Sequence, residues 1–499
     1  MRSQGHGALG PMANASRRSD SPEARSSFRL SRIGPFPDLT SDPSRKRLEH
    51  AIPNSTTATE PSARDEAVQR LLRIEEEGTY LGHGEHRLSD ARAERQAREY
   101  TAGVTRRRRW LDFLMAHFYQ GDFDAMDAPL RQILRVGLYD LLLLSTPPHA
   151  AVNEAVEAAR RRVNPGAAGL ANALLRNVQR HRDALPQPAT GDVARDLAIR
   201  CSHPTWMVRR WVERFGWDEA EALMEAHNRR PAHGLRPNRL RMTPAAFREA
   251  LDEWGLEWEP SPWLDDFVRV TRLQPLVRAG ALAEGRCAVQ DESAGLAVRL
   301  LDPRPGETVV DGCAAPGGKT TYAAALMQGD GRIFAFDRHD GRLDRLRKAA
   351  RAQGIADMLT AETADLRAVA DRSGNAPRAD AVLLDAPCSG LGVLARRADL
   401  RWRRTPDDLD EMAALQDDLL DAAARLVRPG GRLVYSTCTT EPEENEDRVR
   451  AFLQRRADFH LEPADDLPVP VCTPEGGMAT VPHRHDIDGA FAARLRREA

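Results

Sequence analysis

Apolar residues are spaced in different ways along the chain. Between residues 61 and 185 they recur every three or four positions, as in 129–144 and 152–163, and this period predicts an all-α domain. After a polar, proline-containing linker at 186–192, residues 193–280 show two helical patterns followed by strand, helix and strand. This second region is expected to form a small α+β module.

Short apolar strands alternate with amphipathic helical segments from residue 281 to 499. This alternation of strands and helices requires right-handed crossovers and a parallel sheet covered on both faces, so we expect a doubly wound, Rossmann-like α/β domain. Residues 1–60 are rich in Ser, Arg, Pro, Asn and Gly without a sustained period, which predicts a disordered tail. The fold class is therefore multidomain.

Composition indicates the cellular setting. The 499 residues suffice for about three domains. The six cysteines form no CxxC pair and no His/Cys spacing suited to zinc, so we expect free thiols and no metal. The sequence shows neither an apolar run of about 20 residues nor a signal peptide, and we therefore expect a cytoplasmic protein without membrane association.

The basic charge of the chain is almost entirely guanidinium. The formal net charge is −2, yet only Lys46, Lys319 and Lys348 are lysines among 72 basic residues. Part of this bias reflects overall composition, but arginines cluster where acids are sparse, and such clusters can hold phosphates. The clusters lie at 106–109, 160–162, 229–241 and 396–404. Trp206 and Trp211 lie between two of them and could stack on RNA bases, although their helical spacing is also typical of core residues.

Four acidic residues stand at the ends of successive predicted strands: Asp311, Asp337, Asp365 and Asp385. Ligands of doubly wound sheets bind beyond these carboxyl ends. The segment 309–320, VVDGCAAPGGKT, adds glycines that let the backbone approach a ligand closely. Asp337 is placed to bind the ribose hydroxyls of an adenosine cofactor.

A phosphate-binding loop is the obvious alternative, because GGKT resembles the end of GxxxxGK[ST]. The glycine that this motif requires five residues before Gly318 is instead Cys313, so the spacing is wrong for a nucleoside triphosphate. A cofactor with a free ribose and a cationic sulfonium fits better. Lys319 is a compact ammonium in an arginine-rich chain, and we expect it to contact the substrate backbone or a cofactor carboxylate.

Two cysteines follow neighbouring predicted strands, Cys388 after Asp385 and Cys438 in the loop after the next strand. Both thiols are expected at one crevice, where a polar loop favours reactivity over packing. Thr440 and Glu443 have the spacing of a capping box, which predicts a helix starting just after Cys438.

These parts together suit a pyrimidine substrate. A thiolate that adds to carbon 6 of cytosine makes carbon 5 able to attack an activated methyl group. Asp385 could stabilise the ring during addition, and Cys388 or water could remove the hydrogen from carbon 5. The target base would have to leave its stack and enter the crevice.

The ordered motifs 309–320, DAPCSG at 385–390 and YSTCTTEPEENE at 435–446, with QDESA at 290–294, resemble the Sun/Fmu (RsmB-like) family of S-adenosyl-L-methionine-dependent RNA cytosine-5 methyltransferases. The helical region resembles the NusB-like RNA-binding domain of the bacterial members, which methylate 16S ribosomal RNA. The resemblance implies Cys438 as nucleophile, Cys388 in product release and Asp385 in catalysis. It implies cofactor contacts at Cys313, Ala314, Ala315, Pro316, Gly317, Gly318, Lys319, Asp337, Asp365 and Asp385.

The resemblance also implies small-subunit ribosomal RNA as partner, engaged before assembly is complete, and we expect a monomer. A transfer-RNA methyltransferase of the same chemistry and a noncatalytic RNA chaperone remain alternatives. After GLGV the chain departs from the family pattern, with LARRADLRW at 394–402. A substrate-facing arginine is displaced there, and Arg396, Arg397 and Arg401 are the candidates to replace it.

Overall fold

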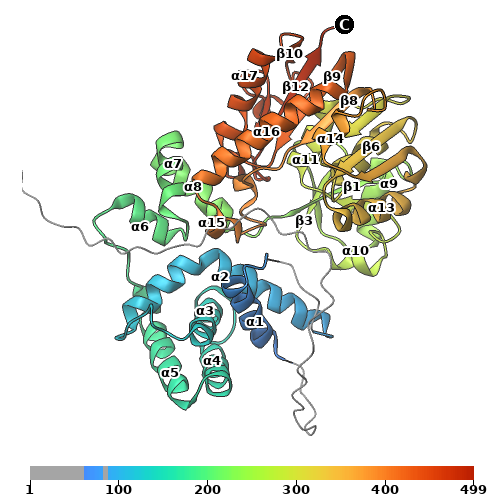
Figure 1. Cartoon of the computed structure of the whole chain (residues 1–499). Helices are drawn as coiled ribbons and strands as arrows, with labels where there is room; N and C mark the ends of the chain where they lie inside the picture. The colour runs from blue at the N-terminus through green and yellow to red at the C-terminus, as the bar shows by residue number, and fades with distance from the viewer. Residues whose placement is uncertain (1–60, 82–87) are drawn as a thin grey trace, which may run out of the picture. The chain divides into compact units, whose positions relative to one another are not determined.

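The structure, a computed structural model, describes residues 61–81 and 88–499. The tail predicted for residues 1–60 lies outside the described residues. The helical region begins with five helices, as its period predicts (Figure 1). They are α1 Ala63–Glu76, α2 Ala91–Phe118, α3 Ala128–Leu143, α4 Pro148–Arg162 and α5 Pro165–Arg180. Asn164 accepts a hydrogen bond from the Ala167 amide at 2.8 Å and so caps α5, while Pro148 starts α4.

The region after the linker contains three helices before its first strand, one more than predicted. Residues 193–215 break at Ser202, whose φ is 57°, and Pro204 precedes the next helix. The helices are α6 Val193–Arg200, α7 Thr205–Phe215 and α8 Trp217–Asn228.

A four-stranded antiparallel sheet follows, in the order β2-β3-β1-β4. Its last strand lies beyond residue 280, where the small module was expected to end, because β4 pairs with β1. The strands are β1 His233–Pro237, β2 Trp258–Pro260, β3 Val268–Val270 and β4 Cys287–Val289, with helices α9 Pro244–Glu253 and α10 Gln274–Arg278.

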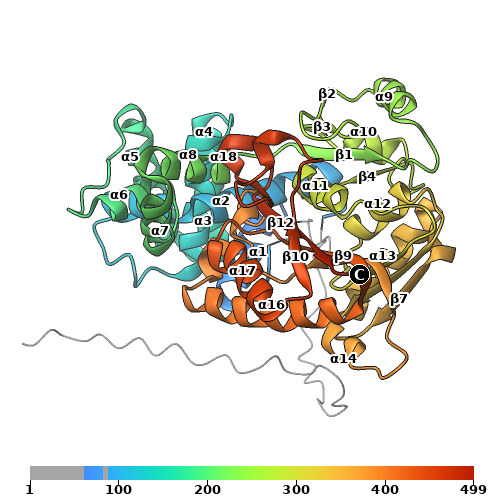
Figure 2. The same cartoon turned by 90° about the horizontal axis from the view of Figure 1, so that it is seen from above.

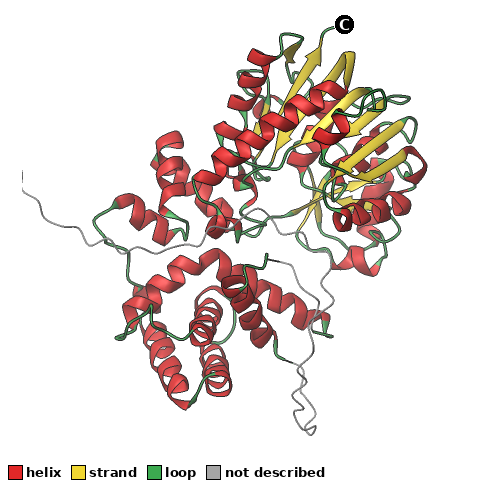
Figure 3. Ribbon diagram, in the orientation of Figure 1, coloured by secondary structure: helices red, strands yellow, loops and turns green. Residues whose placement is uncertain are grey.

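The strands of the C-terminal region form a large sheet (Figure 3). Its order is β10-β12-β9-β8-β5-β6-β7, with β11 paired to β12. Strands β5 to β9 are parallel, as predicted, whereas β10, β11 and β12 pair antiparallel. The connections among these last strands carry no long crossover helix, and parallel pairing needs one. The strands are β5 Thr308–Asp311, β6 Arg332–Asp337, β7 Leu359–Thr363, β8 Ala379–Asp385, β9 Val427–Thr437, β10 Phe459–Glu462, β11 Met478–Thr480 and β12 Ala490–Arg497.

Helices cover both faces of this sheet (Figures 1 and 2). Successive residues of a strand face opposite layers: Val309 packs with α11, α12 and α13, and Val310 packs with α14, α16 and α17. Both faces are therefore apolar, which explains the continuous hydrophobic runs of the central strands. The helices are α11 Glu292–Leu301, α12 Gly318–Leu326, α13 Asp340–Gln353, α14 Leu366–Ala370, α15 Leu400–Arg403, α16 Asp407–Leu426, α17 Glu446–Arg455 and α18 Pro482–His485.

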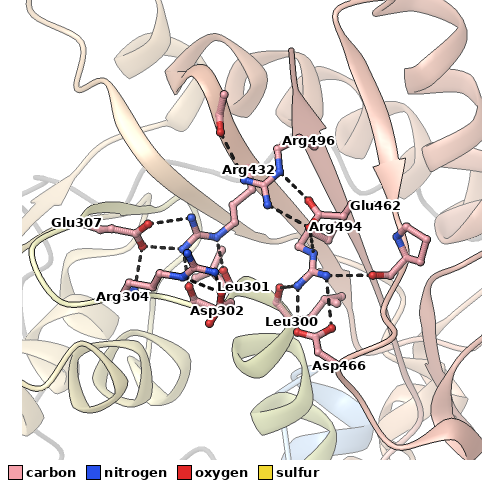
Figure 4. Close-up of polar contacts among 12 residues, drawn as sticks. Leu300, Leu301, Asp302, Arg304, Glu307, Arg432, Glu462, Asp466, Arg494 and Arg496 are labelled. Carbon is pink, nitrogen blue, oxygen red and sulfur yellow. Dashed lines mark hydrogen bonds and ion pairs between the residues drawn. The ribbon is translucent and has the colours of Figure 1, made fainter. Parts of the chain in front are cut away.

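Two arginines on neighbouring strands, Arg432 of β9 and Arg494 of β12, bind the C-terminal end of α11 (Figure 4). Arg432 donates to the carbonyls of Leu301 and Asp302, and Arg494 donates to the carbonyl of Leu300. The last carbonyls of a helix have no partner within it, so these guanidinium groups satisfy them. They fix β9, the strand that leads to the second cysteine loop.

Within the described residues, none of the helices combines the length and apolar character needed to cross a lipid bilayer.

Candidate active site

The four strand-end acids gather around one thiol. Asp311, Asp337 and Asp385 end β5, β6 and β8, and Asp365 lies two residues after β7, where its side chain caps α14. Burial raises the pKa of Cys313 well above its usual range, and all four carboxylates raise it further through their charge. The predicted convergence of these acids at one edge of the sheet is therefore seen.

Asp311 is the most deeply buried of the four acids, with 2% of its surface exposed. Its Oδ2 accepts a hydrogen bond from the Thr320 hydroxyl at 2.7 Å, whereas its Oδ1 has no partner within the described residues. Burial, aided by the charge of Asp385, raises the pKa of Asp311 to about 7. A buried carboxylate oxygen without a partner is costly, so this position suits a cationic ligand group such as an ammonium.

The connection from β5 to α12 comprises residues 312–317. Asp337 holds it in place, because its carboxylate accepts the amide of Ala315 at 3.2 Å and that of His339 at 2.9 Å. Gly317 has a φ of 106°, and a Cβ there would lie 2.5 Å from Leu346. Only glycine fits this turn, after which α12 begins at Gly318.

Lys319 contacts a protein carboxylate, where the sequence suggested a substrate or cofactor group. Its Nζ lies 2.7 Å from Oδ2 of Asp385, whose Oδ1 accepts the Ser436 hydroxyl at 2.9 Å. Burial by itself would lower the pKa of Lys319, but the carboxylate of Asp385 raises it above its ordinary value. The carboxylate therefore keeps the Lys319 ammonium charged beside the ends of β8 and β9.

The two predicted reactive cysteines meet beside this pair. Sγ of Cys388 lies 3.3 Å from Sγ of Cys438, and the amide of Cys438 donates to Sγ of Cys388 at 3.3 Å. The hydrogen bond from Cys388 lowers the pKa of Cys438 against the effect of burial, and Lys319 and Arg397 lower it further. The same hydrogen bond raises the pKa of Cys388. Of the two thiols, Cys438 is therefore the one whose lowered pKa favours ionisation.

The loop after Cys438 does not start a helix through a capping box, so that prediction is wrong. Helix α17 begins only at Glu446, and the Thr440 hydroxyl bonds to Glu441 rather than to the amide of Glu443. Side chains from α7 hold the loop instead: Trp211 Nε1 donates to Glu441 at 3.0 Å. Arg210 of the same helix pairs with both Glu441 and Glu443.

Three family models match successive parts of the chain. Residues 61–180 match the NusB family, and residues 203–276 match the ferredoxin-like domain of RsmF/B-like methyltransferases. Residues 298–496 match the 16S rRNA methyltransferase RsmB/F family.

Curated relatives align over almost their whole length. The probable ribosomal RNA small subunit methyltransferase B of Bacillus subtilis (strain 168) is 33% identical over 453 residues, which cover 88% of this chain and 99% of that protein. The chain belongs to the RsmB/F family of 16S rRNA methyltransferases. The ribosomal RNA small subunit methyltransferase B of Cronobacter sakazakii is 34% identical, covering 86% of this chain and 97% of the relative. The crystal structure of PH0851 aligns with a TM-score of 0.69 at 32% identity, covering 82% of this chain and 91% of that one.

The chain is thus a methyltransferase that depends on S-adenosyl-L-methionine (SAM). The residues fit this cofactor. The unpartnered Oδ1 of Asp311 suits the ammonium of its methionine part, and Asp337 lies at the strand end where a ribose-binding acid is expected. Asp365 is largely occupied, because it accepts both the amide and the guanidinium of Arg367.

The three arginines expected to replace a displaced family residue have different roles in this RsmB/F protein. Arg401 is fully buried and donates to main-chain carbonyls, so it cannot face a substrate. Arg396 pairs with Asp291 and Asp488, each at 2.8 Å. Arg397 is exposed and acts electrostatically on Cys438, so it remains the candidate.

Two further outcomes concern residues outside the motifs. Trp211 is fully buried in the core of α6, α7 and α8, which excludes it from base stacking.

Arg404, which the sequence did not single out, donates to the carbonyls of Ser389 at 2.9 Å and Cys388 at 3.3 Å. The cluster at 396–404 was the only signal for it, because contact with a distant main chain leaves no pattern in the sequence.

Proposed function

We propose that this RsmB/F family member methylates carbon 5 of a cytidine in 16S ribosomal RNA, through a covalent bond between Cys438 and carbon 6 of the base. The observation that carries the proposal is the pair of thiols 3.3 Å apart, next to the ion pair of Lys319 and Asp385. The small-subunit ribosomal RNA named for the relatives supports the choice of substrate.

Cys438 supplies the nucleophile. Its lowered pKa favours the thiolate, and the thiolate, not the thiol, adds to carbon. The Sγ–C6 bond forms while the ring electrons shift toward N3 and O2 and make carbon 5 nucleophilic. Asp385 lies close by and, as a carboxylate paired with Lys319, can accept hydrogen bonds from the exocyclic amine of cytosine. These contacts would hold the ring over Cys438.

SAM, when bound, supplies the electrophilic methyl group on its sulfonium. This chain positions the two reactants through separate strand ends: Asp311 and Asp337 follow β5 and β6, whereas Asp385 and the cysteines follow β8 and β9. Because the sheet order places β5 next to β8, the two sets are adjacent. Orientation of this kind converts a reaction of two solutes into one within a single complex.

Cys388 is suited to the release step. While Cys438 is a thiolate, their hydrogen bond keeps the proton on Cys388. Once the Cys438 sulfur is bonded to carbon 6 that negative charge is gone, so Cys388 can lose its proton to solvent. The amide of Cys438 stabilises the resulting thiolate. Cys388 then takes the hydrogen of carbon 5, the Sγ–C6 bond breaks, and the Cys438 thiolate leaves.

Tritium release tests the proposal. The full chain is incubated with SAM and a 16S transcript made with [5-³H]cytidine. Methylation at carbon 5 must expel one tritium for each methyl group transferred, whereas methylation of the exocyclic amine or a ribose expels none. Bisulfite mapping of the product then identifies the cytidine. Methyl transfer without tritium release would reject carbon 5 as the target.

A further inference from the structure

A cavity of about 390 Å³ lies between α2 of the NusB domain and the segment that follows β8. Its volume lies within the range of small-molecule sites and is ample for a nucleotide. Its walls come from α2, α7, α15 and their flanks, and they are rich in arginine and tryptophan. The lining residues are Arg108, Arg109, Asp112, Pro204, Trp206, Arg401, Trp402 and Arg404.

Three of the four arginines that line this cavity, Arg108, Arg109 and Arg401, form no ion pair within the described residues, whereas Arg404 pairs with Asp408 at 3.6 Å. Asp112 is its single acid, and both oxygens of Asp112 accept from the guanidinium of Arg135, at 2.7 and 2.9 Å. Within the part of the chain that the structure describes, no acid lies at ion-pair distance from Arg108, whose guanidinium stacks 4.3 Å above the Trp402 ring. Arg109 donates to the carbonyl of His203 rather than to a carboxylate.

Burial lowers the pKa of Arg108 to about 10. An arginine in this state lacks the carboxylate that normally accompanies a buried guanidinium, and an anionic ligand would supply it. Trp206 is half-buried and offers an apolar wall beside the charge. This combination of guanidinium groups and an indole surface suits a phosphate with its attached nucleoside.

The cavity is connected to the cysteine loop through four consecutive residues. Trp402 Nε1 donates to the carbonyl of Thr105 in α2 at 2.7 Å, and Arg401 donates to the carbonyl of Arg106 at 3.2 Å. Arg404, at the other end, reaches the carbonyl of Cys388. A ligand in the cavity therefore lies between the NusB domain and the thiol pair.

We infer that this cavity binds a backbone phosphate of the RNA strand close to the target cytidine, with Arg108 as its principal contact. The inference rests on the proposed function for the identity of the strand. Because phosphates carry no sequence information, this contact would fix the position of the strand rather than select the base. It would let the NusB domain register the RNA relative to Cys438.

Equilibrium binding of a 16S transcript to the full chain tests this assignment. Arg108→Gln is expected to weaken binding about tenfold and to reduce the salt dependence by about one phosphate contact. Arg95→Gln is the matched control, because it removes the same charge from an exposed position on the same helix and should leave binding within twofold. A melting temperature within a few degrees of the parent shows that the variant is folded.

Single methylphosphonate substitutions in the RNA provide a second measurement that uses the parent protein. One neutralised phosphate near the target should weaken binding about as much as Arg108→Gln does, and should have no further effect on that variant. The assignment is overturned if Arg108→Gln and the parent bind RNA with equal affinity and equal salt dependence. It is also overturned if the effect of Arg108→Gln and the effect of each methylphosphonate add at every phosphate. The binding measurements do not require methyl transfer. Their result is therefore independent of the result of the tritium assay.

Discussion

The sulfur atoms of Cys388 and Cys438 lie 3.3 Å apart, although fifty residues separate them in the chain. Their proximity follows from the strand pairing in the sheet. Strands β8 and β9 are parallel neighbours whose register pairs Asp385 with Ser436, so the loops that follow leave the same edge side by side. In the proposed mechanism this contact lets Cys438 act as the nucleophile while Cys388 keeps its proton until the covalent adduct has formed.

Replacing the nucleophile should abolish methyl transfer. We expect Cys438→Ala to lower the rate by about 10⁴-fold or more, since the proposed Sγ–C6 bond cannot form without this sulfur. Cys472→Ala is the control, because this cysteine lies between β10 and β11 and donates to main-chain carbonyls there. Transfer of labelled methyl groups from SAM to a 16S transcript measures both. An undiminished rate in Cys438→Ala would reject its role.

Replacing Cys388 should stop the reaction after the covalent bond has formed. In Cys388→Ala the hydrogen at carbon 5 loses its proposed acceptor, so the Sγ–C6 bond cannot break by this route. We expect a protein–RNA species that survives denaturing electrophoresis and disappears when Cys438→Ala is combined with it. Free RNA alone in the Cys388→Ala lane would contradict the release role.

The pH dependence of the reaction should report on Lys319. The pKa of Cys438 is lowered, so kcat/KM rises with pH until the thiolate is fully formed, and the rise ends near that pKa. Lys319→Gln removes a cation and leaves Asp385 unpaired, and both changes raise the pKa of Cys438. The rising limb should therefore move to higher pH by about one unit. Lys348→Gln, an exposed lysine on α13, should leave the profile unchanged.

The fold was largely predictable from the chain because its main signals are local. The continuous apolar run of β8 and the helical repeats of α2 and α3 each lie within one segment, and they identified the domain types correctly. The strand-end acids could be predicted together because parallel strands share an edge. Predictions failed where a distant segment decides the environment. Arg401 is buried against carbonyls of α2, of α8 and of Ser202 in the turn before α7, and α7 holds the loop that resembled a capping box.

Arg396 should contribute to stability more than to catalysis. It binds Asp291 and Asp488, whose side chains are about nine-tenths buried, and burial with the charge of Asp291 raises the pKa of Asp488 to about 7. Arg396→Met leaves both acids unpaired and should cost about 3–5 kcal/mol at pH 8. The loss should be smaller at pH 5, where Asp488 is protonated. Arg304→Met breaks an exposed pair with Asp302 and should cost less than about 1 kcal/mol.

Chemical denaturation across this pH range checks the Arg396 prediction. Equal losses at pH 5 and pH 8 would show that Asp488 does not carry the effect. A loss no larger than that of Arg304→Met would show that the two carboxylates are already solvated.

Asp311 should link stability to cofactor binding. Its pKa rises from 3.8 to about 7 on folding, so the folded state favours the protonated acid. The stability that this preference gives is fully present below pH 3.8 and is lost as pH rises through about 7. Between pH 4 and pH 8 the parent should lose up to roughly 4 kcal/mol relative to Asp311→Asn, whose amide does not ionise. Asp357→Asn, an exposed acid, should show no such difference.

SAM should reverse this effect in the parent protein, because its ammonium can pair with the ionised Asp311. Saturating SAM at pH 8 should therefore raise the melting temperature of the parent more than that of Asp311→Asn, and the variant should bind SAM about tenfold more weakly in calorimetry. The two readouts depend on the same oxygen atom. If Asp311→Asn gains stability at pH 8 yet binds SAM as tightly as the parent, the SAM ammonium binds elsewhere. The pH dependence of stability would still arise from the buried carboxyl of Asp311.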